Sequence, residues 1–159
     1  MSTAPDFDEW VAARGQPLLR LAYVLTGDPV EAEEIVEDAL SRALPRWSRI
    51  SRRHDPDASV RRLVVRAHVS RLRRFRRRHA PPPPPLELVA TTGITIEVPD
   101  LIWPACGSLP RDQRTALVLC YYEGLSDEEI ADLTGVRAGS VRSQISQGIA
   151  AVRAELAEL

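Results

Sequence analysis

The sequence predicts an all-α protein made of two small helical domains that a proline-rich linker joins. Apolar residues recur at helical spacing through residues 7–43, 60–75 and 109–156. A run of five prolines stands between the last two of these segments, and such a run adopts a stiff, extended conformation. We therefore expect domains in residues 1–80 and 100–159, with residues 81–99 as the linker.

The charges of the chain are strongly segregated, although its 159 residues sum to a net charge of only −1. Residues 49–79 hold twelve arginines against two aspartates, a local excess of +10, whereas residues 1–41 hold nine acids against two arginines. This division predicts one part that attracts phosphate and others that repel it or meet a basic protein.

The cysteines and histidines do not form a pattern typical of a metal or redox site. Cys106 and Cys120 stand in apolar surroundings without Cys-x-x-Cys spacing, so we expect reduced core residues. His54, His68 and His79 all fall in the basic segment, which favours exposed positions near phosphate over metal binding. The chain has neither a membrane span nor a signal peptide in its sequence, and this predicts a cytoplasmic protein.

Two helices are expected in the first 45 residues. The first ends at Thr26–Gly27, and Pro17 within it predicts a kink or two shorter pieces. Asp28 is expected to cap the second helix, with Pro29 at its first position and Pro45 ending or bending it. The outer face of this second helix is acidic; its acids are Glu31, Glu33, Glu34, Glu37 and Asp38. These acids are also compatible with a plain solvated face.

The third segment begins with a polar loop at residues 51–57, from which Asp57 is expected to cap a basic helix. Arginine at this density predicts an anionic partner, and nucleic acid is the usual one. A merely solvated basic face is the alternative interpretation. The arginines around the apolar positions of this helix are Arg61, Arg62, Arg66, Arg73, Arg74 and Arg77.

Residues 125–153 contain two helix signatures separated by a short turn. Ser126 and Glu129 have the spacing of a capping box, and Gly135 suits a left-handed helix end. The second, longer helix carries one apolar stripe, formed by Val141, Ile145, Ile149, Val152 and Leu156. Hydrogen-bonding side chains without any acid cover its other face, namely Ser140, Arg142, Ser143, Gln144, Ser146 and Gln147.

This arrangement is typical of a helix-turn-helix whose second helix enters the DNA major groove. Arginine, glutamine and serine are side chains that bind base edges and phosphates there. An ordinary helical hairpin with a solvated face would show the same apolar pattern.

The motifs in their order resemble the extracytoplasmic-function (ECF) sigma factors of the σ70 family, most closely the short SigE-like group from actinobacteria. An acidic helix follows TGD, then come RW and DPD before the arginine-rich helix, and a linker precedes LPRDQRTALVLCYYEGLSDEEIADLTGVRAGSVRSQI. The resemblance covers nearly the whole chain except the linker, and the C-terminal stretch is its most specific part.

The resemblance implies roles for individual residues. The acidic helix is implied to dock on the coiled coil of the largest RNA polymerase subunit through Glu33, Glu34, Glu37 and Asp38. The loop and basic helix are implied to open and hold the −10 promoter element, with a flipped base in the loop. The residues implied there are Arg52, Arg53, His54, Arg62, Arg66, Arg73, Arg74 and Arg77. The C-terminal domain is implied to contact the polymerase flap and to read the −35 element through Arg137, Ser140, Arg142, Ser143, Gln144 and Gln147.

Some positions depart from the family pattern. Arg137 stands where a serine or threonine usually caps the recognition helix, and Gln147 where an arginine is usual. In the basic helix, Arg66 replaces an asparagine and Leu72 a tryptophan, while Pro104 interrupts the first helix of the C-terminal domain. These departures favour a specialised promoter preference or weak promoter activity.

The predicted function is therefore promoter recognition as a subunit of RNA polymerase, without enzymatic activity, cofactor, metal or small-molecule substrate. Core RNA polymerase and promoter DNA are the expected partners, and an anti-sigma factor is a candidate third. Two alternatives remain open. One is a sigma-like adapter that binds polymerase or a regulator without initiating transcription, and the other is a stand-alone helix-turn-helix regulator.

Overall fold

The computed structural model of the protein describes residues 5–78 and 105–158, and all regular structure in these ranges is helical. The prediction of an all-α protein is thereby confirmed. The chain forms two compact units, residues 1–70 and 71–159, which divide inside a single helix. The predicted linker at residues 81–99, together with His79 and Pro104, lies outside the described residues.

The first helix, α1 (Phe7–Thr26), continues through Pro17, so the chain does not divide into two pieces there. The other alternative, a kink at Pro17, stays a prediction. Proline lacks the N–H group that would bond the carbonyl of Ala13, four residues earlier. Both residues are exposed, so water can satisfy that carbonyl, and the helix tolerates the proline. Gly27 ends α1 in the left-handed conformation with φ 69°.

The second helix, α2 (Pro29–Ala43), begins as the sequence predicts. The Asp28 side chain accepts hydrogen bonds from the backbone N–H groups of Val30 at 2.9 Å and Glu31 at 3.3 Å. Pro29 occupies the first helical turn, where no N–H is needed. The helix ends before Pro45, and the chain turns through a 3₁₀ segment, Leu44–Arg46, into the short α3 (Trp47–Ile50).

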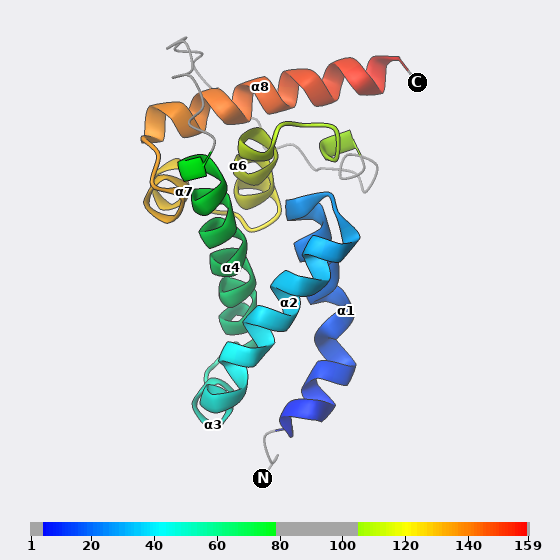
Figure 1. The fold of residues 1–159 in the computed structure, drawn as a ribbon, viewed down its shortest axis with the longest axis vertical. Helices are drawn as coiled ribbons and strands as arrows, with labels where there is room; N and C mark the ends of the chain where they lie inside the picture. Colours follow the sequence, from blue (N-terminus) through cyan, green and yellow to red (C-terminus); the bar gives the residue numbers. More distant parts are fainter. Residues whose placement is uncertain (1–4, 79–104, 159) are drawn as a thin grey trace. The chain divides into compact units, whose positions relative to one another are not determined.

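In the N-terminal unit, α1 and α2 lie antiparallel and pack along their length (Figure 1). Ala22, Ala32 and Ala39 are fully buried, and such small side chains let two helix backbones approach closely. The larger buried side chains of this core are Trp10, Leu18, Leu21, Leu25, Ile35, Val36, Ile50, Val60 and Val64.

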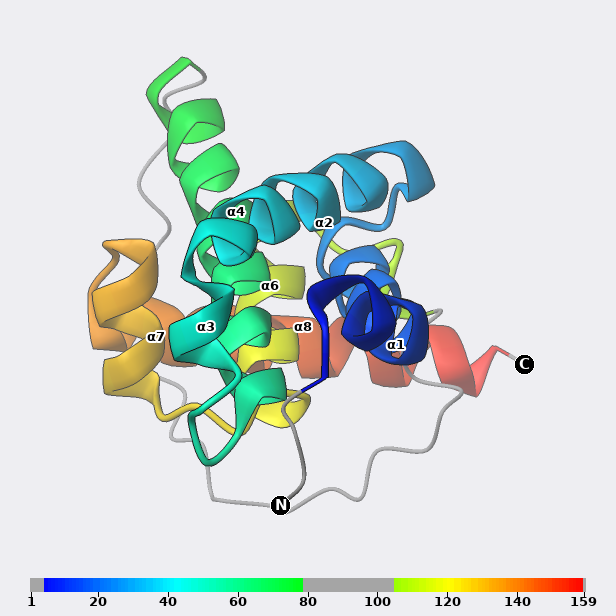
Figure 2. The ribbon, with the colours of Figure 1, turned by 90° about the horizontal axis from the view of Figure 1, so that it is seen from below.

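The basic helix is α4 (Pro56–Arg78), and it follows the loop that leaves α3 (Figure 2). Its capping residue is Asp55, whose carboxylate accepts a hydrogen bond from the Ala58 backbone N–H at 3.0 Å. The prediction that Asp57 caps this helix is wrong. Pro56 takes the first helical position, where proline is favoured, and this places Asp57 inside the first turn.

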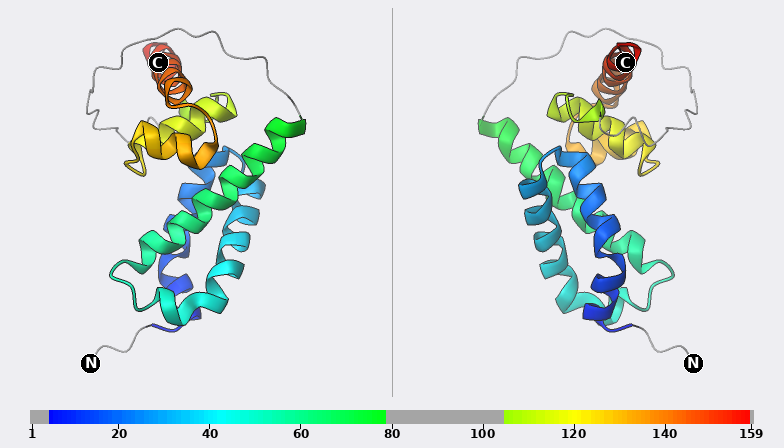
Figure 3. Two further views of the ribbon diagram at one scale, coloured as in Figure 1. Left: turned by 90° about the vertical axis from the view of Figure 1, so that its left-hand side faces the viewer. Right: turned by 90° about the vertical axis from the view of Figure 1, so that its right-hand side faces the viewer.

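The C-terminal unit contains the end of α4, α6 (Arg111–Tyr121), α7 (Asp127–Thr134) and α8 (Ala138–Ala157). The long α8 lies across α6 and α7 (Figures 1 and 3). The apolar core between these helices includes Cys106, Leu109, Leu117, Val118, Leu119, Ile130, Val141, Ile145 and Val152. Within residues 5–78 and 105–158, no helix is both long enough and apolar enough to cross a membrane.

Candidate nucleic-acid interface

Helix α7 has the ends that its sequence predicts. The Ser126 hydroxyl accepts a hydrogen bond from the Glu129 backbone N–H at 3.2 Å. The Glu129 carboxylate accepts one from the Ser126 hydroxyl, instead of from the backbone N–H that a full capping box would use. Gly135 ends α7 with φ 74°, and only two residues separate it from the start of α8. The turn between the helices is therefore short and tightly defined.

The apolar stripe of α8 is buried as predicted at three of its five positions. Val141, Ile145 and Val152 are at most 4% exposed, while Ile149 and Leu156 are partly covered. Burial of this stripe fixes the rotation of α8 about its axis, so the hydrogen-bonding residues of the helix fall on its other sides.

Three of the predicted −35 residues make contacts within the domain. Gln147 accepts a hydrogen bond from Gln113 of α6 at 3.0 Å and donates one to Ser143 at 3.4 Å. The Arg142 guanidinium lies 3.9 Å from the Asp127 carboxylate at the start of α7, and about two-fifths of its side chain remains exposed. Ser140 and Gln144 are half-buried on the first turns of α8.

Arg137 stands at the N-cap of α8, and its side chain makes no capping hydrogen bond. The first turn of α8 therefore lacks the side-chain cap that a helix usually has at this position. Serine or threonine at that position would normally satisfy one of the first backbone N–H groups.

The elements on either side of the loop before α4 are held by aromatic side chains of α1 and α3. The indole of Trp10 donates a hydrogen bond to Asp57 at 3.0 Å, and Arg14 lies 3.5 Å from the same carboxylate. The Trp47 ring lies 5.2 Å from Trp10 and 5.4 Å from Phe7, measured between ring centroids. The sequence analysis missed this anchor, which joins residues far apart in the chain.

The basic residues predicted to meet the −10 element divide into two groups. Arg52, Arg53 and His54 are exposed in the anchored loop. The other five are exposed along α4, and they are Arg62, Arg66, Arg73, Arg74 and Arg77. Of these, Arg73 donates a hydrogen bond to the Thr134 carbonyl oxygen in the C-terminal unit.

His68 is not where the sequence analysis placed it. His68 is buried at 2% exposure, so the expectation of an exposed histidine is wrong. Its spacing of four from Val64 and Leu72, both buried, places it on the apolar face of α4. Phe75, on the same helix, is 42% exposed, and the Arg111 guanidinium lies 5.0 Å from its ring centroid.

The acidic surface of α2 is formed by Glu33, Glu34 and Glu37, which are exposed, and by Asp38, which is half-buried beside Arg42. Two apolar side chains at the ends of this helix are also exposed, Val30 at 64% and Leu44 at 55%. These two side chains stand at opposite ends of the helix, on either side of the acids in the sequence. The sequence analysis noted the acids but missed these apolar neighbours.

A buried arginine closes the turn before α6. The Arg114 guanidinium donates hydrogen bonds to the carbonyl oxygens of Cys106 at 3.0 Å, Gly107 at 2.9 Å and Leu109 at 2.8 Å. The sequence analysis overlooked Arg114, although its spacing of three from the buried Leu117 indicates an inward position. This side chain holds the segment against which α8 packs.

The two cysteines are free thiols; Cys106 is buried in the core as predicted, whereas Cys120 is only partly buried. Burial raises the pKa of Cys106 to about 11, and burial also raises the pKa of Cys120. Both groups are therefore protonated at neutral pH and are poor nucleophiles or metal ligands. Across residues 5–78 and 105–158, no group of His, Cys, Asp and Glu side chains is arranged to hold a metal ion.

Comparison with known proteins agrees with this geometry. The family described as Sigma-70, region 4 matches residues 103–152. The RNA polymerase sigma-E factor of Streptomyces coelicolor is 30% identical over 164 residues, which cover 98% of this chain and 89% of that protein. The ECF RNA polymerase sigma factor SigM of Mycobacterium tuberculosis is 30% identical over 155 residues, covering 96% of this chain and 76% of that protein.

A solved structure has a similar fold. It is a co-crystal structure of the sigma factor RpoE with the anti-sigma factor NepR from Bartonella quintana. The TM-score is 0.56 with 21% sequence identity, and the match covers 95% of this chain and 96% of that chain. The relatives at 30% identity, which match nearly the whole chain, settle the family. The chain belongs to the ECF family of RNA polymerase sigma factors.

Proposed function

We propose that the chain initiates transcription by binding core RNA polymerase and reading two promoter elements with separate surfaces. The observation that carries this proposal is the geometry of α7 and α8. A capped α7 and a left-handed Gly135 lead into a helix whose apolar stripe is buried and whose other sides present serine, glutamine and arginine. This is the construction of a helix that enters the major groove.

The −35 element is assigned to α8. Arg142 and Gln144 lie in its first two turns, off the buried stripe, where a recognition helix meets base edges. Arg137, Ser140, Ser143 and Gln147 complete the proposed contact set. The pairing of Gln147 with Gln113 supports a positioning role for Gln147 beside any contact with DNA.

The −10 element is assigned to the loop before α4 and to the basic face of α4. The anchor formed by Trp10 and Asp57 supports this assignment, because a loop that captures a flipped base must itself be held in place. Exposed Arg52, Arg53 and His54 belong to this loop. Farther along the helix, Arg62 and Arg66 share one side, because four residues separate them.

The acidic surface of α2 is assigned to core RNA polymerase, on the coiled coil of its largest subunit. Exposed acids flanked by Val30 and Leu44 combine charge attraction with apolar burial, which suits a basic protein surface.

Further assignments are a contact of the C-terminal domain with the polymerase flap, control by an anti-sigma factor and a cytoplasmic location. Functionally, the domains are residues 1–80 and 100–159, joined by 81–99.

Run-off transcription tests the proposal directly. The chain is combined with core RNA polymerase of Streptomyces coelicolor and a DNA library that is randomised at the −35 and −10 elements, and the products are sequenced. Products from a defined start site with enriched elements are expected. Core binding without a product would instead identify a sigma-like adapter, and DNA binding without core binding a stand-alone regulator. Either result would overturn the proposal.

A further inference from the structure

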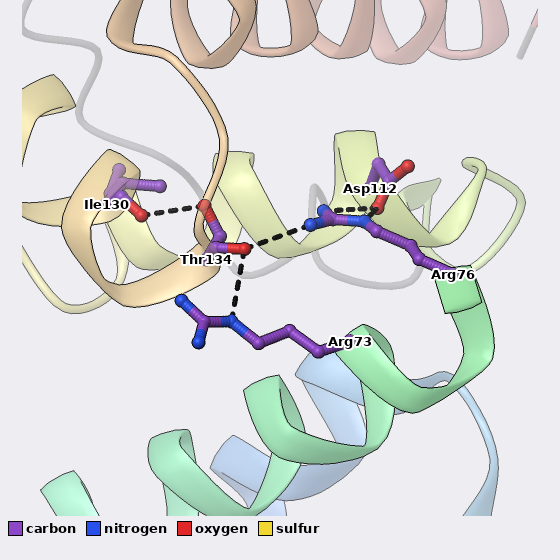
Figure 4. A network of polar contacts seen from close by, with 5 residues as sticks. All are labelled: Arg73, Arg76, Asp112, Ile130 and Thr134. Carbon is purple, nitrogen blue, oxygen red and sulfur yellow. Dashed lines mark hydrogen bonds and ion pairs between the residues drawn. The ribbon is translucent and has the colours of Figure 1, made fainter. Parts of the chain in front are cut away.

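The last two turns of α4 contact the helix-turn-helix through arginine side chains (Figure 4). Arg76 donates two hydrogen bonds to one Asp112 carboxylate oxygen, from Nε at 3.0 Å and from Nη2 at 2.6 Å. Its Nη1 donates a third, at 3.0 Å, to the carbonyl oxygen of Thr134. The Nε of Arg73 donates to the same carbonyl oxygen at 3.3 Å. All four residues belong to the C-terminal unit.

The acceptor groups form a built site for a guanidinium. Thr134 is the last residue of α7, and carbonyl groups at a helix C-terminus lack helical partners and carry partial negative charge. Asp112 adds a full negative charge from the first turn of α6. Gly135 contributes by having no side chain, since a Cβ there would lie 2.9 Å from the Arg73 guanidinium.

The contact is well covered for a pair of charged side chains. The side chain of Arg76 is 18% exposed and that of Asp112 is 33% exposed. Beside them, the Arg111 guanidinium lies over the Phe75 ring, so a second cation joins the same two helices. Three of the five guanidinium donors of Arg76 are used, and little of its side chain is left for another anion.

We infer that Asp112 and the C-terminal end of α7 form an arginine-binding surface that the end of α4 occupies, and that DNA phosphate competes with this surface for Arg73 and Arg76. The DNA part of this inference rests on the proposed function. Arg73 was assigned to promoter DNA by resemblance, yet its guanidinium lies against the helix-turn-helix. Arg76, which donates to both Asp112 and Thr134, cannot neutralise a phosphate without leaving these acceptors.

The competition is energetically feasible because the contact is not strong. Exposed ion pairs contribute little to stability, and partial burial strengthens this one only in part. In the closed form, Arg73 and Arg76 contact Thr134 and Asp112. If only the open form binds DNA fully, the observed affinity is the affinity of the open form multiplied by the fraction of chains that are open. The contact thus lowers affinity for DNA of any sequence without preventing binding.

The closed form is tested first without DNA, by amide hydrogen exchange in the full chain. Asp112→Asn removes the charge that Arg76 needs, and Asp132→Asn removes the same charge from an exposed position on α7. Faster exchange is expected in residues 71–78 and 131–137 of Asp112→Asn, with no change in Asp132→Asn. Arg76→Gln should reproduce the effect of Asp112→Asn. The exchanged pair Arg76→Glu with Asp112→Arg should recover part of the protection, and equal exchange in all variants would overturn the contact.

Competition with DNA is tested by titrating the same variants with a duplex oligonucleotide of mixed sequence. Asp112→Asn is expected to bind roughly 3- to 10-fold more tightly than Asp132→Asn, because both lose one negative charge but only the first frees Arg76. Equal affinities, weaker binding by Asp112→Asn or no binding by any variant would overturn the competition. Failure of run-off transcription would leave the exchange result intact, so the two proposals fail separately.

Discussion

The indole Nε1 of Trp10 donates a hydrogen bond to Asp57 at 3.0 Å across a sequence separation of 47 residues. This bond joins the first turns of α1 and α4, and Arg14 lies on the other oxygen of the same carboxylate. Trp10 is only 6% exposed, and this bond gives its indole N–H group an acceptor. The bond therefore fixes the start of α4, directly after the loop at residues 51–55, although no residue of that loop takes part in it.

Replacing Asp57 with alanine is expected to lower the free energy of unfolding by about 1–2 kcal/mol, because the buried indole N–H loses its acceptor. Chemical denaturation followed by circular dichroism measures this. Asp8→Ala, an exposed acid in the first turn of α1, is the matched control and should change stability by less. If both variants unfold alike, the Trp10–Asp57 bond does not anchor the loop.

Replacing Arg114 with leucine is expected to destabilise the fold by about 3 kcal/mol, since three backbone carbonyl groups lose their donor. Thermal unfolding of the full chain checks this. Arg153→Leu removes an exposed arginine from α8 and serves as the control, with little change expected. Equal melting temperatures for the two variants would show that water replaces the Arg114 side chain.

Reversing two acids on α2, Glu37→Arg together with Asp38→Arg, is expected to weaken binding to core RNA polymerase. Like charges across an interface cost several kcal/mol in unfavourable cases, so a loss of about 100-fold is reasonable. Fluorescence anisotropy with labelled chain measures the affinity. Reversal of Asp8 and Glu9 on α1 controls for the change in net charge. Unchanged core affinity with intact helicity would contradict the docking assignment.

Replacing Arg142 with alanine is expected to reduce −35-dependent transcription while leaving core binding and folding intact. A base contact would account for about 1–3 kcal/mol and would relax specificity at one position, whereas a phosphate contact would weaken all −35 sequences alike. Run-off transcription across substituted −35 elements separates these two roles. Arg153→Ala, later on the same helix, is the control. If Arg142→Ala transcribes like the parent on every template, Arg142 does not touch DNA.

The stability of the chain is expected to fall as pH rises from about 9 towards 11. Burial raises the pKa of Cys106 from 9.0 to about 11, so in this range the folded chain keeps a proton that the unfolded chain has lost. The stabilisation is complete below pH 9 and is lost towards pH 11. Urea unfolding at several pH values should show a smaller fall for Cys106→Ala than for the parent. A similar fall in both would assign the effect to other groups.

Features that depend on neighbours in sequence were predicted well. Asp28 with Pro29, Ser126 with Glu129, and Gly135 all lie within a few residues of the helix ends that they determine. Periodicity gave the buried face of α8 for the same reason. The cap of α4 was misplaced by two residues because Asp55 and Asp57 both precede apolar positions, and only Pro56 between them decides which one caps.

Features that depend on distant residues were missed. Arg76 and Thr134 are separated by 58 residues, and no local sequence pattern around either residue predicts that they are in contact. The sequence analysis gave Arg77 a role and Arg76 none, and the structure shows that Arg76 is held by Asp112 while Arg77 is exposed. His68 is different, because its spacing from Val64 and Leu72 was already sufficient to place it inside.

Helix α8 begins at Ala138, and its N-cap residue Arg137 has no side-chain bond to the first amide groups of the helix. A helix end in this state frays readily, and its first turn gains order when an external acceptor arrives. The cost of ordering that turn would then offset part of the free energy of DNA binding, and it would make the entropy of binding less favourable. Warming should therefore lower the affinity of the parent chain for DNA more than it lowers the affinity of the Arg137→Ser variant, whose serine supplies the missing cap. The departure at this single position would then make promoter reading sensitive to temperature.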